Sequence, residues 1–276
     1  MDPGDYDDLI LPVPPEPFAL IVGALAASVD SNAIEALMRR MGLQPEPLND
    51  GEGNETVLLA PRFRLRFGGG VSVLAGTAAP SMLDFADPTD PATSLLAASL
   101  PPGWRDAGAC WLFFPDRDNA AAGTASPVQM REFFKTTVLL IDMFDASHIF
   151  WSPARLWSDA VQFRASIAEM LASGMPPVLH LVAFRRREVD GVDSIGTRGL
   201  AHFTGQELEA PIPPAWTVAD VVRRLSRLAL DAMLNGPIRY PRTMRGLDAG
   251  ERIGVLPPTG RAAPYATVRV EFGRDA

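Results

Sequence analysis

Cysteine and histidine are scarce in this chain of 276 residues. Cys110 is the single cysteine, so the chain can form no internal disulfide and no thiolate cluster around a metal. The three histidines, His148, His180 and His202, are far apart, and their spacing does not match that of a zinc site. We therefore expect no metal ion.

An excess of positive charge is also lacking. The chain has 25 basic and 33 acidic side chains, a formal net charge of -8. This balance repels phosphate backbones and anionic lipid surfaces, so we expect neither nucleic acid nor membrane as a partner. The apolar run Phe18–Ala27 is only ten residues, too short to span a bilayer, and Met1–Asp5 has no basic residue of the kind that begins a signal peptide. We expect a cytoplasmic protein.

Signature motifs of catalysis are missing as well. Gly68–Gly70 is not followed by the Lys-Ser/Thr pair of a phosphate-binding loop, and a strand rather than a helix is expected after it. Neither a Gly-x-Ser-x-Gly nor a His-Glu-x-x-His pattern occurs. We therefore assign no catalytic residue and expect no cofactor.

What the chain does have is the composition of a folded protein, with 47% apolar and 21% charged residues. Apolar and charged residues alternate over Arg62–Phe67, which predicts a strand with one buried face. Thr217–Leu234 is the clearest helix, opened by Thr217 and Asp220 as a capping box. The mixture of hairpins and helices predicts an α+β fold, a mainly antiparallel sheet with helices packed on one face. Two related halves are a further hypothesis.

Composition also suggests a division of the chain. Residues 1–17 are rich in Asp and Pro and are expected to form a flexible acidic arm. Residues 18–77 are predicted to form an N-terminal βαββ unit. The Pro-, Ser- and Asp-rich residues 78–103 are expected to be a linker or surface loop, and residues 104–276 a C-terminal α+β unit packed with the first as one globule.

The most unusual stretch combines two tryptophans, a serine and an arginine: Trp151, Ser152, Arg155 and Trp157. Ser152 before a proline is typical of a helix start, which would place Arg155 in the first helical turn, where its charge opposes the helix dipole. Because such junctions expose backbone N–H groups, we predict a ligand pocket here. The alternative is that the tryptophans belong to the core and the arginine forms a salt bridge.

A second candidate group is Thr197, Arg198 and Glu207. If Glu207 and Glu209 lie on one strand, they share a face, and paired carboxylates can perform acid-base chemistry or bind a cation. The alternative is the solvated face of an edge strand. The short arginine runs favour a solvated face over a nucleic-acid groove. They are Arg185, Arg186 and Arg187 and, on the last helix, Arg223, Arg224 and Arg227.

Four segments resemble those of a bacterial protein family catalogued as a domain of unknown function. They are Lys135–Leu140, Ala146–Trp151, Thr197–Leu200 (a Thr-x-Gly-Leu motif) and the acidic strand Gly205–Glu209. The resemblance runs from about Phe18 to the end of the chain. It implies a fold and a bacterial cytosolic setting and brings no mechanism. The segment Asp248–Gly254 departs from the Asp-Thr-Ile-Gly-like turn of that family.

Two functions remain open from the sequence. The first is a non-catalytic binding or adaptor protein that holds a protein partner or a small ligand. The second is a small-molecule enzyme of unrecognised type, such as a hydrolase, using Glu207, Glu209, His148 or Arg155. We favour the binding protein because no catalytic motif is present. The sequence leaves the oligomeric state and the ligand open.

Overall fold

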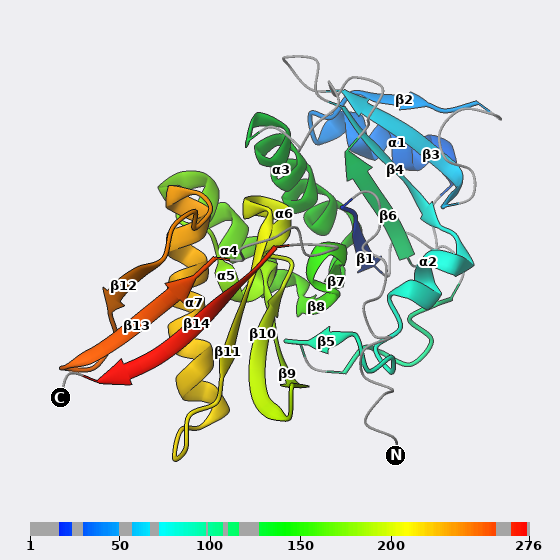
Figure 1. Cartoon of the computed structure of the whole chain (residues 1–276). Coiled ribbons are helices and arrows are strands. Elements are labelled where there is room, and N and C mark those ends of the chain that lie inside the picture. Colours follow the sequence, from blue (N-terminus) through cyan, green and yellow to red (C-terminus); the bar gives the residue numbers. More distant parts are fainter. Residues whose placement is uncertain are drawn as a thin grey trace. The chain divides into compact units, whose positions relative to one another are not determined.

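The computed structural model describes residues 17–23, 30–49, 57–66, 72–97, 99–106, 110–115, 127–257 and 266–274. The chain divides into two compact units, Met1–Gly174 and Met175–Ala276. One sheet has eight strands and the other six, and both are mostly antiparallel (Figure 1). The α+β class is thus confirmed, with two sheets in place of the single one expected. The expected acidic arm, apart from Pro17, and the turn at Gly68–Gly70 lie outside the described residues.

The sheet of the first unit has the order β2-β3-β4-β6-β1-β7-β8-β5. β1 is central and pairs antiparallel with both β6 and β7. Strands that are covered on both faces read as continuous apolar runs, which explains the apolar sequences of β1 and β6. The strands are β1 (Ala19–Gly23), β2 (Pro45–Pro47), β3 (Leu58–Arg66), β4 (Ser72–Ala78), β5 (Ser94–Leu95), β6 (Cys110–Pro115), β7 (Ala146–Trp151) and β8 (Leu156–Asp159).

Helices cover one face of this sheet. α3 contacts β1, β6 and β7, and α4 contacts β7 and β8. Aromatic rings fill this interface: Trp111 packs against Phe144, and Trp151 against Phe133 and Phe134. The helices of the unit are α1 (Ser31–Arg40), α2 (Pro80–Phe85), α3 (Pro127–Phe144) and α4 (Ala160–Ser173), with a 3-10 turn at Ser152–Ala154.

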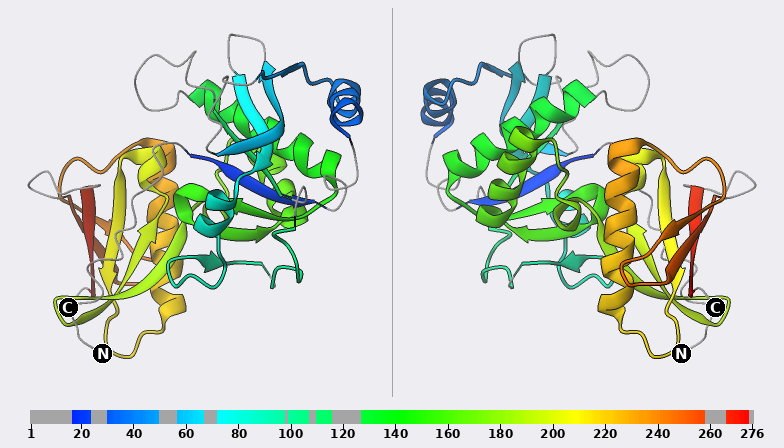
Figure 2. Two further views of the ribbon diagram at one scale, coloured as in Figure 1. Left: turned by 90° about the vertical axis from the view of Figure 1, so that its right-hand side faces the viewer. Right: turned by 90° about the vertical axis from the view of Figure 1, so that its left-hand side faces the viewer.

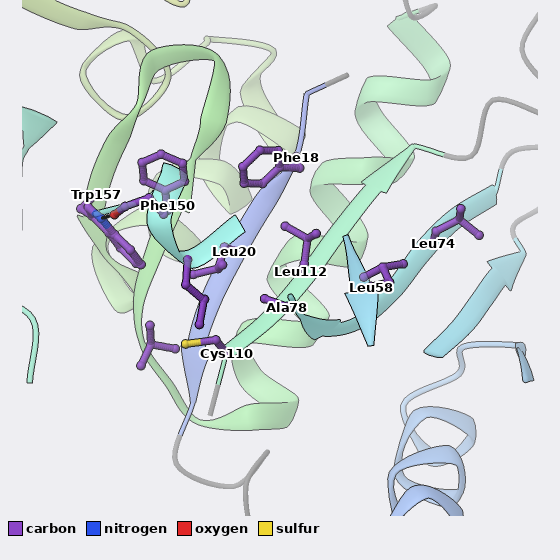
Figure 3. Close-up of a cluster of buried hydrophobic side chains, with 12 residues drawn as sticks. Phe18, Leu20, Leu58, Leu74, Ala78, Cys110, Leu112, Phe150 and Trp157 are labelled. Carbon is purple, nitrogen blue, oxygen red and sulfur yellow. Dashed lines mark hydrogen bonds between the residues drawn. The ribbon is translucent and has the colours of Figure 1, made fainter. Parts of the chain in front are cut away.

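The other face of the sheet is covered by residues 80–104. Figure 3 shows Leu20, Leu112, Phe150 and Trp157 in this cluster, which α2 completes with Leu83. The stretch 78–103 is therefore not a linker between units. β4 before it and β6 after it pair with each other, so it is an excursion from one sheet that packs back onto that sheet.

The division of the chain also differs from the expected one. β1, at the start of the expected N-terminal unit, pairs with β6 and β7 of the expected C-terminal unit. The chain divides after Gly174 instead. Composition marks residues 78–103 as irregular, and irregular segments of this kind occur within a unit as well as between units.

The sheet of the second unit has the order β12-β13-β14-β11-β10-β9, with β11 and β14 parallel and the other pairs antiparallel. α7 lies along one face of these strands (Figure 2) and begins at Thr217 with the expected capping box to Asp220. The strands are β9 (Ala183–Val189), β10 (Val192–Arg198), β11 (Gln206–Pro211), β12 (Arg242–Arg245), β13 (Glu251–Leu256) and β14 (Ala266–Arg274); the helices are α5 (Val178–Leu181), α6 (Ala201–Thr204) and α7 (Val218–Asn235).

Side chains alternate between the two faces of this sheet. The face toward α7 is apolar and buried: Ile195, Leu208, Ala210, Ile253, Val255, Val268 and Val270. We call the opposite side, away from α7, the outer face. Among the described helices, none is both long enough and apolar enough to cross a membrane.

Candidate functional site

Arg155 does not lie in a helix. Ser152 and Pro153 begin only a single 3-10 turn, Arg155 follows in the left-handed conformation (φ 45°), and β8 then pairs with β7. The helix begins at Ala160 and is capped by the side chain of Asp159. The expected place of Arg155 in a first helical turn is therefore wrong. Ser152 and Pro153 do not begin an α-helix, because the residues after them form β8 and pair with β7.

The side chain of Arg155 is buried, with 1% of its surface exposed. Its Nη2 donates to the carbonyl oxygen of Phe85 (2.7 Å), to Oδ2 of Asp90 (2.7 Å) and to Oγ1 of Thr93 (3.2 Å). The guanidinium also stacks over the Phe85 ring, 4.5 Å from its centroid. Arg155 therefore fixes the segment around residues 85–93 onto the sheet.

The neighbouring site residues are buried in the same way. Trp157 Nε1 donates to the carbonyl of Ala86 (2.7 Å), and Ser152 Oγ accepts from the backbone N–H of Phe18 (2.8 Å). The ring of Trp151 lies under α3. This geometry matches the alternative in which these tryptophans belong to the core and Arg155 forms an ion pair. Ligand binding by these residues stays a prediction.

Two members of the second predicted group, Thr197 and Glu207, are in contact. Glu207 Oε2 accepts from Thr197 Oγ1 (2.6 Å), and Oε1 accepts from the backbone N–H groups of Gly199 (2.9 Å) and Ala201 (3.0 Å). Burial raises the pKa of Glu207, although these hydrogen bonds oppose the shift. The Thr-x-Gly-Leu segment and the acidic strand are thus joined by one carboxyl group, which ties the turn before α6 to β11. Arg198 is half-buried.

This arrangement gives a prediction for Glu207. Glu207→Ala leaves buried N–H groups without an acceptor and is expected to lower the free energy of unfolding by about 2 kcal/mol, whereas Glu207→Gln keeps one acceptor oxygen and costs less. Because burial raises the pKa in the folded state, the wild type should gain stability relative to the Gln variant as the pH falls from 7 toward 4.5. Urea unfolding at several pH values measures the free energy of unfolding of both proteins. A difference between the wild type and Glu207→Gln that does not change with pH would contradict the prediction.

Arginines gather on the outer face of the six-stranded sheet. Strand alternation and register place six arginines and three glutamates there, in a chain whose net charge is -8. Of the glutamates, Glu207 is held by backbone N–H groups and Glu209 forms an ion pair with Arg187. The outer face is therefore a local basic surface. Its charged residues are Arg185, Arg187, Arg198, Glu207, Glu209, Arg245, Arg252, Arg269 and Glu271.

Two of these arginines stand directly opposite each other. Arg245 of β12 is the register partner of Arg252 of β13, and both are exposed. Like charges directly opposite in a strand pair destabilise it. Within the described ranges, neither Arg245 nor Arg269 has an ion-pair partner. An open hollow of about 680 Å³, lined by residues 243–252, lies at this end of the hairpin.

The two carboxylates of the same hairpin, Asp248 and Glu251, bind Arg224 of α7. Glu251 Oε2 accepts from the backbone N–H groups of Leu247 and Asp248, both at 2.9 Å, and the Glu251 carboxylate pairs with Arg224 of α7. Asp248 Oδ2 also accepts from Arg224, at 2.6 Å. A Cβ on Gly246 would lie 2.3 Å from Cδ of Glu251, so this position accepts only glycine without rearrangement. Both carboxylates thus bind Arg224.

Arg224 corrects a sequence interpretation. The sequence predicts Arg224 on the solvated face of the last helix, whereas its side chain is 2% exposed and lies over the Trp216 ring, 4.1 Å from the centroid. The signal was present, because Arg224 falls three residues after Val221 and four before Leu228, both of which are buried. A second open hollow, of about 570 Å³, is lined by Trp216, Arg224 and Asp248 among others.

Two further reactive groups, the Cys110 thiol and the His202 imidazole, are buried and uncharged near neutral pH. The Cys110 thiol donates to the carbonyl of Trp104, and burial raises its pKa to about 12, so it carries no thiolate near neutral pH. Burial lowers the pKa of His202 to about 4, which keeps its imidazole neutral. In the part of the chain that the structure describes, no three His, Cys, Asp or Glu residues are grouped to hold a metal ion.

Comparisons with known proteins add no relative to this picture. A scan of protein-family models found no match, and searches of curated proteins and of solved structures found none either. The resemblance to a bacterial family of unknown function stays a prediction, and function must be argued from the geometry.

Proposed function

We propose that this chain is a non-catalytic binding or adaptor protein that holds an acidic protein partner on the outer face of its six-stranded sheet. One observation carries the proposal: Arg245 and Arg252 face each other across β12 and β13, on the same face as Arg269. A chain with a net charge of -8 concentrates positive charge at this place.

An acidic partner would offset the repulsion between these arginines. Guanidinium groups bind carboxylates through two parallel N–H···O bonds, and this geometry makes arginine better suited than lysine to carboxylate recognition. Charge complementarity of this kind speeds association and excludes wrong partners. The two carboxylates nearest to these arginines in sequence, Asp248 and Glu251, bind Arg224.

Protein is favoured over nucleic acid as the partner. The strand positions that alternate onto the outer face hold no aromatic residue in the described strands, so the face offers no ring on which bases could stack. The negative charge of the whole chain also opposes binding to a phosphate backbone.

The proposal predicts a loss of affinity for an acidic peptide. A fluorescein-labelled peptide of ten glutamates is the probe, and fluorescence anisotropy measures its Kd. Arg245→Ala and Arg252→Ala are each expected to weaken binding about fivefold, the effect of about 1 kcal/mol from one exposed ion pair. Raising the NaCl concentration to about 0.5 M should weaken binding of the wild type by screening.

The control is Arg223→Ala. Arg223 is an exposed arginine of α7, with 64% of its side chain accessible, and is not on the outer face. Its loss should leave the Kd unchanged. The proposal is overturned if the Arg245→Ala/Arg252→Ala double variant binds the peptide as the wild type does. It is also overturned if a 20-nucleotide oligo-dT binds more tightly than the peptide and loses affinity in the same variants.

A further inference from the structure

The free edge of the same sheet suggests how the acidic partner is held. We propose that an extended acidic segment of the partner binds as an added strand along β12; this inference rests on the proposed function. β12 is the last strand of the sheet order, and among the described residues no strand pairs with its other side. Arg242, Thr243 and Arg245 of this strand are exposed.

The direction of the backbone groups follows from the hairpin. Gly246 N–H donates to the carbonyl of Glu251 (2.9 Å), which fixes the phase of the ladder. In an antiparallel pair, hydrogen-bonded positions alternate with positions whose N–H and C=O point outward. The backbone N–H and C=O groups of Arg242 and Met244 therefore point toward β13. Those of Thr243 and Arg245 point toward the free edge.

The backbone groups of β12 and the nearby arginine side chains would both contribute to binding of the added strand. A strand added beside β12 would have its outer-face side chains about 5 Å from those of Thr243 and Arg245, measured between Cβ atoms. Carboxylates at these positions lie within reach of the Arg245 and Arg252 guanidinium groups. The main-chain hydrogen bonds would supply affinity and the arginines would select acidic sequences, as in other cases of strand addition.

The opposite edge of the sheet is less suited to this role. β9 is also an edge strand and carries Arg185, Arg186 and Arg187. However, Arg186 forms a bidentate ion pair with Asp193, and Arg187 pairs with Glu209. These contacts already pair two of the three arginines of β9. On β12, Arg242 pairs with Asp231, whereas Arg245 has no ion-pair partner among the described residues, so Arg245 supplies the charge for a partner at this edge.

The test removes one outward N–H group. Thr243→Pro deletes the donor at the free edge, a position where proline is tolerated because it breaks no ladder bond to β13. We expect Thr243→Pro to weaken binding of the decaglutamate probe at least fivefold, the loss of about one hydrogen bond plus steric exclusion. Thr243→Val keeps the N–H and should bind within about twofold of the wild type, the usual size of the effect of an exposed substitution.

The outcomes separate the two proposals. Wild-type affinity in Thr243→Pro together with weak binding in Arg245→Ala overturns strand addition and leaves the basic surface standing. Wild-type affinity in both variants overturns both. Because Thr243→Pro could disturb the hairpin, a second measurement uses the unaltered protein and a decaglutamate methylated at every peptide nitrogen. Strand addition requires that this peptide bind at least fivefold more weakly; equal affinity overturns it.

Discussion

Replacing Arg155 by alanine is expected to lower the free energy of unfolding of the first unit by about 3 kcal/mol or more. The substitution empties the volume of a large, fully buried side chain. It also leaves the carbonyl of Phe85 without its donor and Asp90 without its counter-ion. Both costs act on residues 80–104, the segment that packs on the second face of the eight-stranded sheet.

The effect should be concentrated in residues 80–104. Arg155 and Trp157 bind the backbone of this segment at Phe85 and Ala86, and Cys110 binds it at Trp104. Urea unfolding gives the global loss. Limited proteolysis should show faster cleavage between residues 80 and 104 in Arg155→Ala than in the wild type, because this segment unfolds locally before the rest of the sheet.

Arg164→Ala is the matched control. Arg164 pairs with Asp142 within the same unit, but both side chains are exposed by more than a third, 44% and 36%. Loss of such an exposed pair costs at most about 1 kcal/mol. An equal loss of stability in the two variants would show that burial of Arg155 does not have the effect described. Arg155→Lys should fall between them, because lysine keeps the charge and lacks the planar fork.

The Arg155 region also shows what sequence reasoning can and cannot reach. The sequence marks Ser152, Arg155 and Trp157 as an unusual combination, and in the structure Arg155 is buried and paired with Asp90. Its partners, however, lie about 65 residues earlier in the chain, in a stretch whose composition suggested a linker. No local pattern predicts a contact of that separation.

Local signals did predict elements. The capping box of Thr217 and Asp220 and the apolar stripe of α7 are both present in the structure, and the apolar runs of β1 and β6 are buried strands. The pairing of β1 with β6 and β7 was not predictable, because strand order depends on long-range packing. Composition suggests a linker or surface loop at residues 78–103, whereas the contacts divide the chain after Gly174.

The basic surface was missed for the same reason. Its arginines come from β9, β10, β12, β13 and β14, so each appears in the sequence as an isolated charge or a short run. Alternation alone tells which residues of one strand share a face. Only the register between strands, such as Arg245 opposite Arg252, shows that the charges of different strands meet.

The second large effect is expected at the Arg224–Glu251 pair. Both side chains are 2% exposed, and Glu251 also accepts from two backbone N–H groups of the hairpin loop. Arg224→Ala should lower the free energy of unfolding of the second unit by about 3–5 kcal/mol, because a buried carboxylate is left without its counter-ion. Hydrogen exchange in α7 and β13 measures the loss, with the first unit as an internal reference.

The control for Arg224→Ala is Arg223→Ala, one residue away on the same helix. Arg223 pairs with Asp220 on an exposed surface, so its loss should cost less than about 1 kcal/mol. Arg224→Met combined with Glu251→Leu is expected to recover part of the loss, since apolar residues of similar volume remove both buried charges at once. If the double variant is as unstable as Arg224→Ala, uncompensated charge is not the cause.

The pH dependence gives an independent check on the same pair. Burial by itself raises the pKa of Glu251, but hydrogen bonds from Arg224 and from the backbone of Asp248 and Leu247 outweigh it, so the pKa in the folded state lies below its usual value. A lowered pKa means that the pair contributes fully above the unfolded value of about 4.3 and that this stability is lost as the pH falls through the folded pKa. Glu251→Gln should be less stable than the wild type at pH 7, and the difference should shrink toward pH 3. A difference that stays constant over this range would show that the carboxylate charge of Glu251 does not hold Arg224 and the hairpin together.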